Sequence, residues 1–312
     1  QGAFHGKTLG ALAALSTNRF REPFLTHLVG VTHLPYAYCY RCPFEKEYPG
    51  CDIFCAGYLE YTLDNPQSGV AGVAAVIMEP VQGASGWIIP PAEFVQRVAS
   101  ICRQRGILLI ADEIITGWGR TGKLFGMEHY GVVPDIMVIG KGLSGAIYPM
   151  SATCHRPHLD VFFQRNPFIH LSSFGGAALG SVAALAMLDQ ITEPGFLEHV
   201  QAMGERFEAG FADLQARYPT LVAGWRRRGL MMGLEMTDER LGLAMSPLLA
   251  QNGVLAVFAD HRPSTVQLMP PLIIQPAEVD FVLEALDRSL MFAREHPELL
   301  EMVSSVSQVL GV

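Results

Sequence analysis

In Ile107-Leu108-Leu109-Ile110-Ala111-Asp112, five apolar residues in a row end at a carboxylate. A continuous apolar run of this length is typical of a strand that is buried on both faces of a parallel sheet. Similar runs occupy Val73–Met78 and Ile136–Ile139. Between the first two runs lies Pro90–Arg105, whose apolar residues recur at helical spacing and which Gly106 ends. The pattern predicts a strand–helix–strand unit and therefore an α/β fold.

Each of these predicted strands is followed by a side chain that can ionise, namely Glu79, Asp112 or Lys141. In open parallel sheets, ligands bind beyond the carboxyl ends of the strands, so we expect a site here. Asp112 and Lys141 can be interpreted as a structural ion pair, but such pairs are costly to desolvate. A ligand that uses both charges explains them better. Pyridoxal phosphate does so, because a lysine bonds to its aldehyde while an acid keeps its ring nitrogen protonated.

The second half of the chain has a different pattern, with a long amphipathic helix, short strands and a closing helix. The ranges predicted for these elements are Glu193–Arg217, Gly229–Met236, Val266–Leu268 and Glu278–Glu295. We therefore expect a large domain over residues 1–193 and a smaller C-terminal α+β domain over residues 194–312.

The composition excludes several classes of protein. Of the 312 residues, 50% are hydrophobic and only 17% are charged, which excludes a disordered chain. The chain carries 22 basic and 30 acidic residues, a net charge of −8, which disfavours nucleic acid as a partner. The one basic cluster, Arg226-Arg227-Arg228, is interpreted as a solvated turn beside Gly229.

The lack of a recognisable secretory signal and the low cysteine content favour a soluble, cytoplasmic protein. Gln1–His5 does not resemble a secretory signal. The uncharged stretch between Arg165 and Asp189 contains proline and several glycines, so it predicts a buried loop and helix instead of a membrane span. Six cysteines are too few for a disulfide scaffold, and Cys102 and Cys154 are predicted to be core residues.

Several ordered motifs resemble those of class III aminotransferases, the pyridoxal-phosphate enzymes of fold type I that include ornithine, acetylornithine and ω-amino acid transaminases. The matching segments are Ile110–Gly122, Glu79–Gly83, Pro134-Asp135, Gly142–Pro149, His170–Gly176 and Met269–Leu272. The resemblance spans essentially the whole chain. It implies a mostly parallel central sheet with helices on both faces, beside the smaller domain. It also implies a homodimer with shared active sites, which moves an amino group from an amine or amino acid to a keto acid or aldehyde.

The resemblance assigns roles to residues around the cofactor ring. Lys141 matches the Schiff-base lysine and proton shuttle, and Asp112 matches the partner of the pyridine nitrogen. Ile114 matches the branched side chain on one face of the ring, and Phe4 matches the aromatic on the other. His5, which follows Phe4 in the same motif, is included among the cofactor-binding residues.

Four further residues are assigned to the cofactor site by the same resemblance. Glu79 and Gln82 match residues near the hydroxyl side of the cofactor and Asp112. Ser173 stands where the family has a threonine that reaches the phosphate of the neighbouring subunit, and Ser172 is counted with it. No metal ligand is assigned.

The predicted substrate pocket departs from the ornithine-type pattern at Lys7, Ala84 and Gln267. Lys7 and Gln267 stand in place of arginines, and Ala84 stands in place of an acid. Lysine keeps the charge of arginine but loses its planar bidentate fork. Ile115 also replaces a frequent glutamine. We therefore expect a more apolar pocket and a preference for terminal (ω) amines or aldehydes over standard dicarboxylate acceptors.

A long segment that precedes the motif Phe4-His5-Gly6 in the family, and that holds the phosphate there, has no counterpart in this sequence. We expect the chain to be a fragment of a longer polypeptide. A non-catalytic scaffold subunit that retains the fold is the alternative from another class. Within the family, an aminomutase or racemase remains open, because the first proton transfer is shared.

Three other motifs allow different interpretations. Gly117–Lys123 approaches a phosphate-binding P-loop, but Leu124 stands where a Ser or Thr should bind the metal. Gly117–Gly122 also has the glycine spacing of a dinucleotide-binding turn, but no helical pattern follows it. The third motif is either a zinc site or a free-thiol segment, and it consists of Cys39, Cys42, Cys51 and Cys55.

Overall fold

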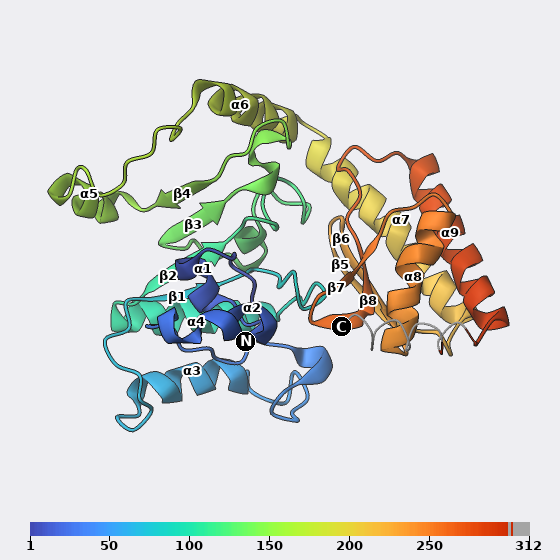
Figure 1. Ribbon diagram of the computed structural model, residues 1–312, viewed down its shortest axis with the longest axis horizontal. Coiled ribbons are helices and arrows are strands. Elements are labelled where there is room, and N and C mark those ends of the chain that lie inside the picture. Colours follow the sequence, from blue (N-terminus) through green and yellow to red (C-terminus); the bar gives the residue numbers. More distant parts are fainter. Residues whose placement is uncertain (299–300, 302–312) are drawn as a thin grey trace.

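The computed structural model describes residues 1–298 and residue 301, and within them the chain forms two four-stranded sheets. The first sheet lies on the left of Figure 1 and the second on the right. The helices that precede the first sheet are α1 (Leu9–Ala14), α2 (Asn18–Arg21) and α3 (Phe54–Asp64). None of the helices in the described residues combines the length and hydropathy needed to span a bilayer.

The first sheet contains the three strands predicted from the apolar runs, followed by a fourth. Its strands, in spatial order, are β1 (Ala75–Met78), β2 (Leu108–Asp112), β3 (Ile136–Ile139) and β4 (Ala152–His155). The pairings of β2 with β1 and with β3 are parallel, and β4 is antiparallel to β3. Because the first three strands run in one direction, their carboxyl ends meet at one edge of the sheet.

Helix α4 (Ala92–Arg105) connects β1 to β2 and confirms the predicted strand–helix–strand unit. Gly106 ends the helix in a left-handed conformation at φ 67°, with its N–H directed to the last carbonyls. The inner face of α4 is fully apolar and packs in the same core as β1 and β2. Its buried residues are Phe94, Val95, Val98, Ala99, Ile101 and Cys102.

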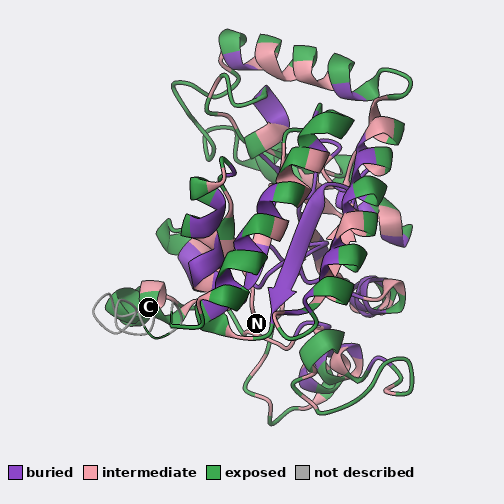
Figure 2. Cartoon of the chain, turned by 90° about the vertical axis from the view of Figure 1, so that its right-hand side faces the viewer, coloured by how far each residue is buried: buried purple, intermediate pink, exposed green. Residues whose placement is uncertain are grey.

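The second sheet is antiparallel and is covered by long helices. Its strands, in spatial order, are β5 (Val222–Arg228), β6 (Met231–Met236), β8 (Arg262–Leu268) and β7 (Val257–Ala259). The covering helices are α7 (Phe196–Arg217), α8 (Glu239–Gln251) and α9 (Pro276–Glu295). Figure 2 faces this half of the molecule, and its helices carry exposed residues on their outer faces. Every residue of β6 is buried, so this strand is the centre of the second core.

The interpretation of Arg226-Arg227-Arg228 as a solvated turn was wrong, because all three residues belong to β5. Arg226 is half-buried and bonds to the buried carboxylate of Glu235 on β6 at 3.2 Å. Arg227 pairs with Glu208. Three adjacent charges predicted that these arginines would be exposed to solvent. An acidic partner on the neighbouring strand, Glu235, makes it possible to bury Arg226.

Two further predictions of burial were wrong. The stretch between Arg165 and Asp189 forms a segment and helix α6 (Ala178–Thr192) that are largely exposed, with Phe168 and Phe174 each about four-fifths exposed. Cys154 is also exposed, since it lies on β4 at the edge of the sheet, whereas Cys102 is buried as predicted. The apolar composition of these stretches predicted that they would be buried. In the described chain, however, no further layer covers them.

The turn between β5 and β6 joins the second half of the chain to the loop that follows β2. Leu230 N–H donates to the carbonyl of Arg120 at 3.0 Å. Gly229 has φ 57°, and a Cβ built on it would lie 2.4 Å from the backbone carbon of Thr121. Glycine is therefore required here both by the left-handed backbone and by the close approach of the two segments.

We predict that Gly229→Ala destabilises the protein clearly more than Gly131→Ala does. Gly131 is the matched control, because it has φ 64° but a Cβ added to it would meet no atom within 4 Å. A left-handed alanine costs about 1–2 kcal/mol in both variants. Gly229→Ala must also displace backbone at the contact between the two halves. Urea unfolding measures both losses, and equal losses would contradict this packing argument.

Candidate active site

The structure brings Glu79, Asp112 and Lys141 together beyond the ends of three adjacent strands. Glu79 follows β1, Asp112 ends β2, and Lys141 follows β3 after Gly140. The Lys141 side chain remains exposed, but the surrounding protein lowers its pKa by desolvation. The carboxylates of Asp112 and Glu79 oppose this shift, because negative charge favours the protonated amine.

Asp112 is buried and held by two hydrogen bonds. Its Oδ2 lies 2.8 Å from Nδ1 of His5, and its Oδ1 accepts the N–H of Ile114 at 3.1 Å. The His5 side chain is itself almost fully buried. These bonds fix the plane of the carboxylate and compensate part of the cost of burying it. Its oxygens retain lone pairs for a further cationic donor.

Glu79 ties the N-terminal segment to the loop after β1. Its Oε1 accepts the N–H of Phe4 at 3.0 Å, and its Oε2 accepts the N–H of Gly83 at 2.8 Å. Burial raises the pKa of this carboxyl to about 7, although the two backbone bonds act in the opposite direction. Glu79 therefore sets the position of Phe4. The Glu79 carboxyl itself changes charge near neutral pH.

Lys141 has an unusual backbone conformation for a residue with a side chain. Its φ is 45°, in the left-handed region, and it begins the 3₁₀ turn η4 (Lys141–Ser144). Such strain persists where the surroundings enforce it and is concentrated at functional sites. Trp118 packs closely against Gly142 in this turn. The packing holds the turn that carries the amine.

The two residues assigned to the faces of the cofactor ring are both tethered to Asp112. Phe4 precedes His5, whose imidazole bonds to the carboxylate, and Ile114 bonds to it through its own N–H. Ile114 also lies beside Gly140, the residue before Lys141, since its Cγ1 would be 3.7 Å from a Cβ built there. Ile114 is thus positioned by Asp112 directly, and Phe4 by Glu79 and through its neighbour His5.

Gln82 and Ala84 belong to the loop after β1, and Gln267 reaches this loop from the second sheet. Gln82 is buried and donates through Nε2 to the carbonyl of Gln1 at 2.8 Å. The Nε2 of Gln267 on β8 donates to the carbonyl of Gly83 at 2.8 Å. Ala84 accepts the N–H of His261 through its carbonyl at 3.0 Å. Neutral hydrogen bonds therefore connect this loop to the N-terminal segment and to the second sheet.

Three residues predicted from the sequence lie apart from this cluster. Lys7 is exposed, and its ammonium lies 3.9 Å from the centre of the Phe20 ring. Ser172 and Ser173 lie in the exposed segment between α5 (Val161–Arg165) and α6, in the upper left of Figure 1. In the described part of the chain, neither serine bonds to a residue of the cluster.

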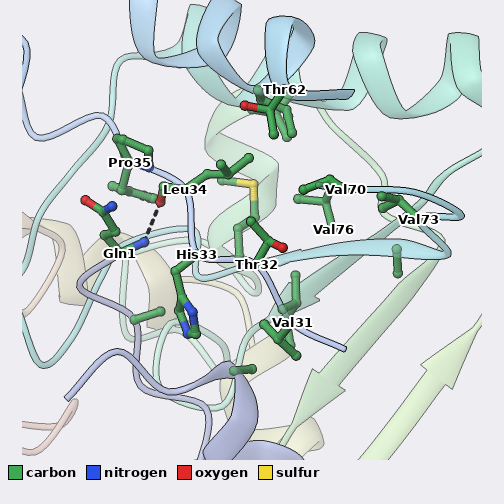
Figure 3. A pocket seen from close by; sticks show the side chains of 18 of the residues that line it. Gln1, Val31, Thr32, His33, Leu34, Pro35, Thr62, Val70, Val73 and Val76 are labelled. Atoms are coloured by element: carbon green, nitrogen blue, oxygen red, sulfur yellow. Dashed lines mark hydrogen bonds between the residues drawn. The ribbon is translucent and has the colours of Figure 1, made fainter. Parts of the chain in front are cut away.

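A cavity of about 690 Å³ opens beside the cluster. His5, Glu79 and Gln82 contribute to its lining, and the cavity extends along β1, whose only strand partner among the described residues is β2. Figure 3 shows Val70, Val73 and Val76 on one side of this space and Leu34 and Pro35 on the other. The cavity therefore has apolar side chains on both of these sides, and the acidic Glu79 belongs to its lining next to the site.

Glu113 is a site residue that sequence reasoning missed. It is fully buried, and its carboxylate accepts the N–H groups of Gly126 and Met127 at 2.8 and 2.7 Å and the hydroxyl of Thr116. It thereby fixes the loop that contains Ile114. Glu113 directly follows Asp112 at the end of the strand, and this position could have identified it from the sequence.

A network of Ser85, Thr17 and His261 was also missed. The His261 ring bonds to Ser85 Oγ at 3.3 Å and to Thr17 Oγ1, and it connects the second sheet to the N-terminal segment. No local pattern could predict it, because Ser85 and His261 are 176 residues apart.

No group of three or more His, Cys, Asp or Glu side chains within residues 1–298 and 301 is arranged to hold a metal ion. The chemically distinctive groups are instead an amine, a buried carboxylate with an imidazole partner, and flanking hydrophobic side chains. This set suits a flat, cationic heteroaromatic ring with an electrophilic carbon.

Comparison with known proteins identifies the family. The profile described as aminotransferase class-III matches residues 1–290. The chain belongs to this family. An uncharacterized aminotransferase of Archaeoglobus fulgidus is 38% identical over 303 residues, which cover 97% of this chain and 66% of that protein. The chain thus spans just under two thirds of the length of this curated relative.

Solved structures of transaminases share the fold. An amine transaminase from an uncultivated Pseudomonas species, in its PLP-bound form, has a TM-score of 0.83 and 28% identity, covering 93% of this chain and 68% of that one. An (S)-enantioselective omega-transaminase from Thermomicrobium roseum has a TM-score of 0.84 and 30% identity, with coverages of 93% and 66%. The expected fold type I architecture is confirmed.

We predict that Glu79 makes stability depend on pH. Its pKa is raised on folding from 4.5 to about 7. The contribution of Glu79 to the free energy of unfolding is therefore fully present below pH 4.5. It is lost as pH rises through about 7, and this loss is at most about 3 kcal/mol. Glu79→Gln removes this dependence, so the difference in unfolding free energy between wild type and variant falls as pH rises.

Urea unfolding at pH 5 and pH 8 measures this difference. Glu205→Gln on the exposed face of α7 is the matched control, for which the difference should change little. A difference for Glu79→Gln that stays constant between the two pH values would contradict the assigned titration.

Proposed function

We propose that this protein is a pyridoxal-phosphate-dependent aminotransferase. The observation that carries the proposal is the buried Asp112 carboxylate, fixed by His5, at the strand end next to that of Lys141. Family membership supports it. So does the likeness to an amine transaminase whose structure contains PLP. The small-molecule substrates would be an amine donor and a keto acid or aldehyde acceptor.

The residues present fit the ring and aldehyde of pyridoxal phosphate. Asp112 would hold the proton on the ring nitrogen, and His5 would keep the carboxylate in the required plane. Phe4 and Ile114, both tethered to Asp112, would enclose the two faces of the ring. Lys141 supplies the amine that would bond to the aldehyde carbon.

When bound, pyridoxal phosphate supplies an electron sink for charge that develops next to the substrate nitrogen. The protein's contribution is to manage protons around that sink. Desolvation by the surrounding protein favours the neutral amine of Lys141, which can accept a proton from the substrate carbon and return it. Negative charge on Asp112 opposes loss of the ring proton, so the sink stays effective.

The substrate preference that we propose is for terminal amines. The loop after β1 carries Ala84, and Gln267 reaches this loop through a neutral bond to Gly83. Neither an alanine nor a glutamine can form an ion pair. A substrate carboxylate would therefore meet no arginine at these two positions, whereas an uncharged group would lose little hydration. Structures of omega-transaminases among the solved relatives support this preference.

We also propose a homodimer in which α6 and the preceding segment face a second copy. These elements expose an unusually large set of apolar side chains: Phe168, Ile169, Leu171, Phe174, Leu179, Val182 and Leu185. Patches of this kind mark protein interfaces. Ser172 and Ser173 lie in the same segment, so the interface would bring their hydroxyls to the partner's cofactor phosphate. A monomer mass from light scattering at micromolar concentration would contradict this proposal.

The boundary between the large and small domains is proposed at residues 193/194. Helix α6 ends at Thr192 and α7 begins at Phe196, with one sheet on each side of this connection. A cytoplasmic location is proposed because all six cysteines are free thiols. Recovery of the protein in a periplasmic or secreted fraction would overturn the proposed location.

We predict that Lys141→Ala abolishes transfer of an amino group from a terminal diamine to an aldehyde acceptor, measured on protein loaded with pyridoxal phosphate. The loss should be about 10²–10⁴-fold, the range expected when a proton-transfer group is removed. Lys123→Ala is the control, because Lys123 is exposed and outside the cluster. Full activity in Lys141→Ala would refute the proposed function.

We predict that Ala84→Glu combined with Gln267→Arg increases the use of 2-oxoglutarate as acceptor. Both positions contact the same loop, so the new charges can pair with each other and the arginine can meet a carboxylate. A gain of about 1.5–3 kcal/mol corresponds to roughly tenfold or more in kcat/KM. Gln267→Arg alone is the control with an uncompensated cation. No gain in the double variant would contradict the assigned pocket.

A further inference from the structure

The side chain of Trp87 fills the space between the loop after β1 and the second sheet. It is buried, with 3% of its surface exposed. Its six-membered ring lies at the loop, since Cζ3 would be 3.4 Å from a Cβ built on Gly83. Its five-membered ring lies at β6, since Cδ1 would be 3.3 Å from a Cβ built on Gly233. The indole therefore extends from the loop to a buried strand of the second sheet.

A hydrogen bond spans the same gap beside the indole. Gln267 of β8 lies opposite Gly233 of β6 in the register of the second sheet. The Nε2 of Gln267 donates to the carbonyl of Gly83 at 2.8 Å. Gly83, Trp87, Gly233 and Gln267 thus form a closed ring of contacts. In this ring, the indole and the amide together fix the separation between the loop and the second sheet.

The indole also reaches the edge of the candidate active site. Trp87 packs with Met231 of β6 in a buried apolar cluster, and Ile115 packs against this cluster. The Cγ2 of Ile115 would be 3.8 Å from a Cβ built on Gly83. Ile115 directly follows Ile114, the residue assigned to one face of the cofactor ring. The second sheet is therefore connected to the site through apolar packing as well as through hydrogen bonds.

The backbone at Trp87 is held in an unfavourable conformation. Its φ is 58°, in the left-handed region, which is costly for a bulky side chain. Gln82 and Ile88 exchange two backbone hydrogen bonds of 3.0 Å across the loop. Arg226 of β5 donates to the carbonyl of Gly86 at 2.6 Å. Strain of this kind persists where the surroundings enforce it and is concentrated at functional sites.

The shape of the indole, not a hydrogen bond, explains the use of a tryptophan at this position. In the part of the chain that the structure describes, the buried Nε1 of Trp87 has no hydrogen-bond partner. A buried donor without an acceptor is a cost to stability. Replacing the indole with a phenyl ring would remove this cost and keep part of the volume. Trp87→Phe is therefore a conservative variant in terms of packing.

We propose that Trp87 is a positioning residue that sets the width of the substrate pocket between the loop after β1 and Gln267. This inference rests on the proposed function, because the pocket that contains Ala84 and Gln267 belongs to it. The indole holds the second sheet at a fixed separation from Gly83, so Gln267 keeps its place at the pocket. A smaller side chain would let the two elements shift and would remove contacts to the part of the substrate away from the reacting carbon. Contacts of that kind are equal in the ground state and the transition state, so their loss raises KM and leaves kcat unchanged.

The test measures KM and kcat for a terminal diamine, with an aldehyde acceptor, on protein loaded with pyridoxal phosphate. We expect Trp87→Leu to raise KM about tenfold while kcat changes by less than about twofold. Trp87→Phe should restore most of the wild-type KM. Trp225→Leu is the matched control, because Trp225 packs against the core of the second sheet. Its KM should stay close to that of the wild type.

A second variant tests the ring of contacts itself. Gln267→Leu removes the hydrogen bond to Gly83 and should raise KM on its own. In the Trp87→Leu background the same change should raise KM clearly less, because both side chains hold the same gap and their effects are not additive. Urea unfolding of the same four proteins should show the same non-additivity in the unfolding equilibrium constants. That measurement does not depend on enzymatic activity.

The inference is refuted if KM is unchanged in Trp87→Leu, or if it rises equally in Trp225→Leu. A fall in kcat at constant KM would also refute it, because the indole would then act on the chemical step. Additive effects of Trp87→Leu and Gln267→Leu would contradict the ring of contacts. Wild-type protein that transfers no amino group would refute the proposed function and this inference together. Any of the other results, obtained with an active wild type, refutes this inference alone.

Discussion

The structure depends on how the charge of Asp112 is accommodated at the end of a buried strand. A carboxylate in this position is stable only if other groups satisfy its oxygens. His5 and the N–H of Ile114 do so, and they draw the N-terminal segment and the loop after β2 onto the strand end. Because β3 lies directly beside β2, Lys141 is then placed next to this acid. One electrostatic requirement thus assembles the amine, the acid and both flanking hydrophobic groups.

The loop after β1 connects this centre to the rest of the molecule. Glu79 bonds to Phe4 on one side and to Gly83 on the other, and Gln267 reaches the same loop from the second sheet. Arg226 of β5 also donates to the carbonyl of Gly86 in this loop at 2.6 Å. The second sheet is therefore attached to the site through hydrogen bonds to main-chain carbonyls.

The sequence predicted those parts of the fold whose signals are local. Strands β1 to β3 and helix α4 were predicted because each is an apolar pattern with a clear end signal, such as Gly106. Strand β5 was missed because the burial of Arg226 depends on Glu235 of the adjacent strand. Likewise, Lys141 and Asp112 could be found at strand ends, but the bond between His5 and Asp112 joins residues 107 positions apart. Only the three-dimensional structure shows which group orients the acid.

The most direct test of the proposed site locates the lysine that captures the cofactor. The chain has four lysines, Lys7, Lys46, Lys123 and Lys141, so borohydride reduction after incubation with pyridoxal phosphate, followed by peptide mass spectrometry, can survey all of them. We predict that the stable pyridoxyl label appears on Lys141 at one equivalent per chain, because desolvation by the surrounding protein lowers the pKa of its amine. A label on Lys7, Lys46 or Lys123 with Lys141 unmodified would contradict the proposed site.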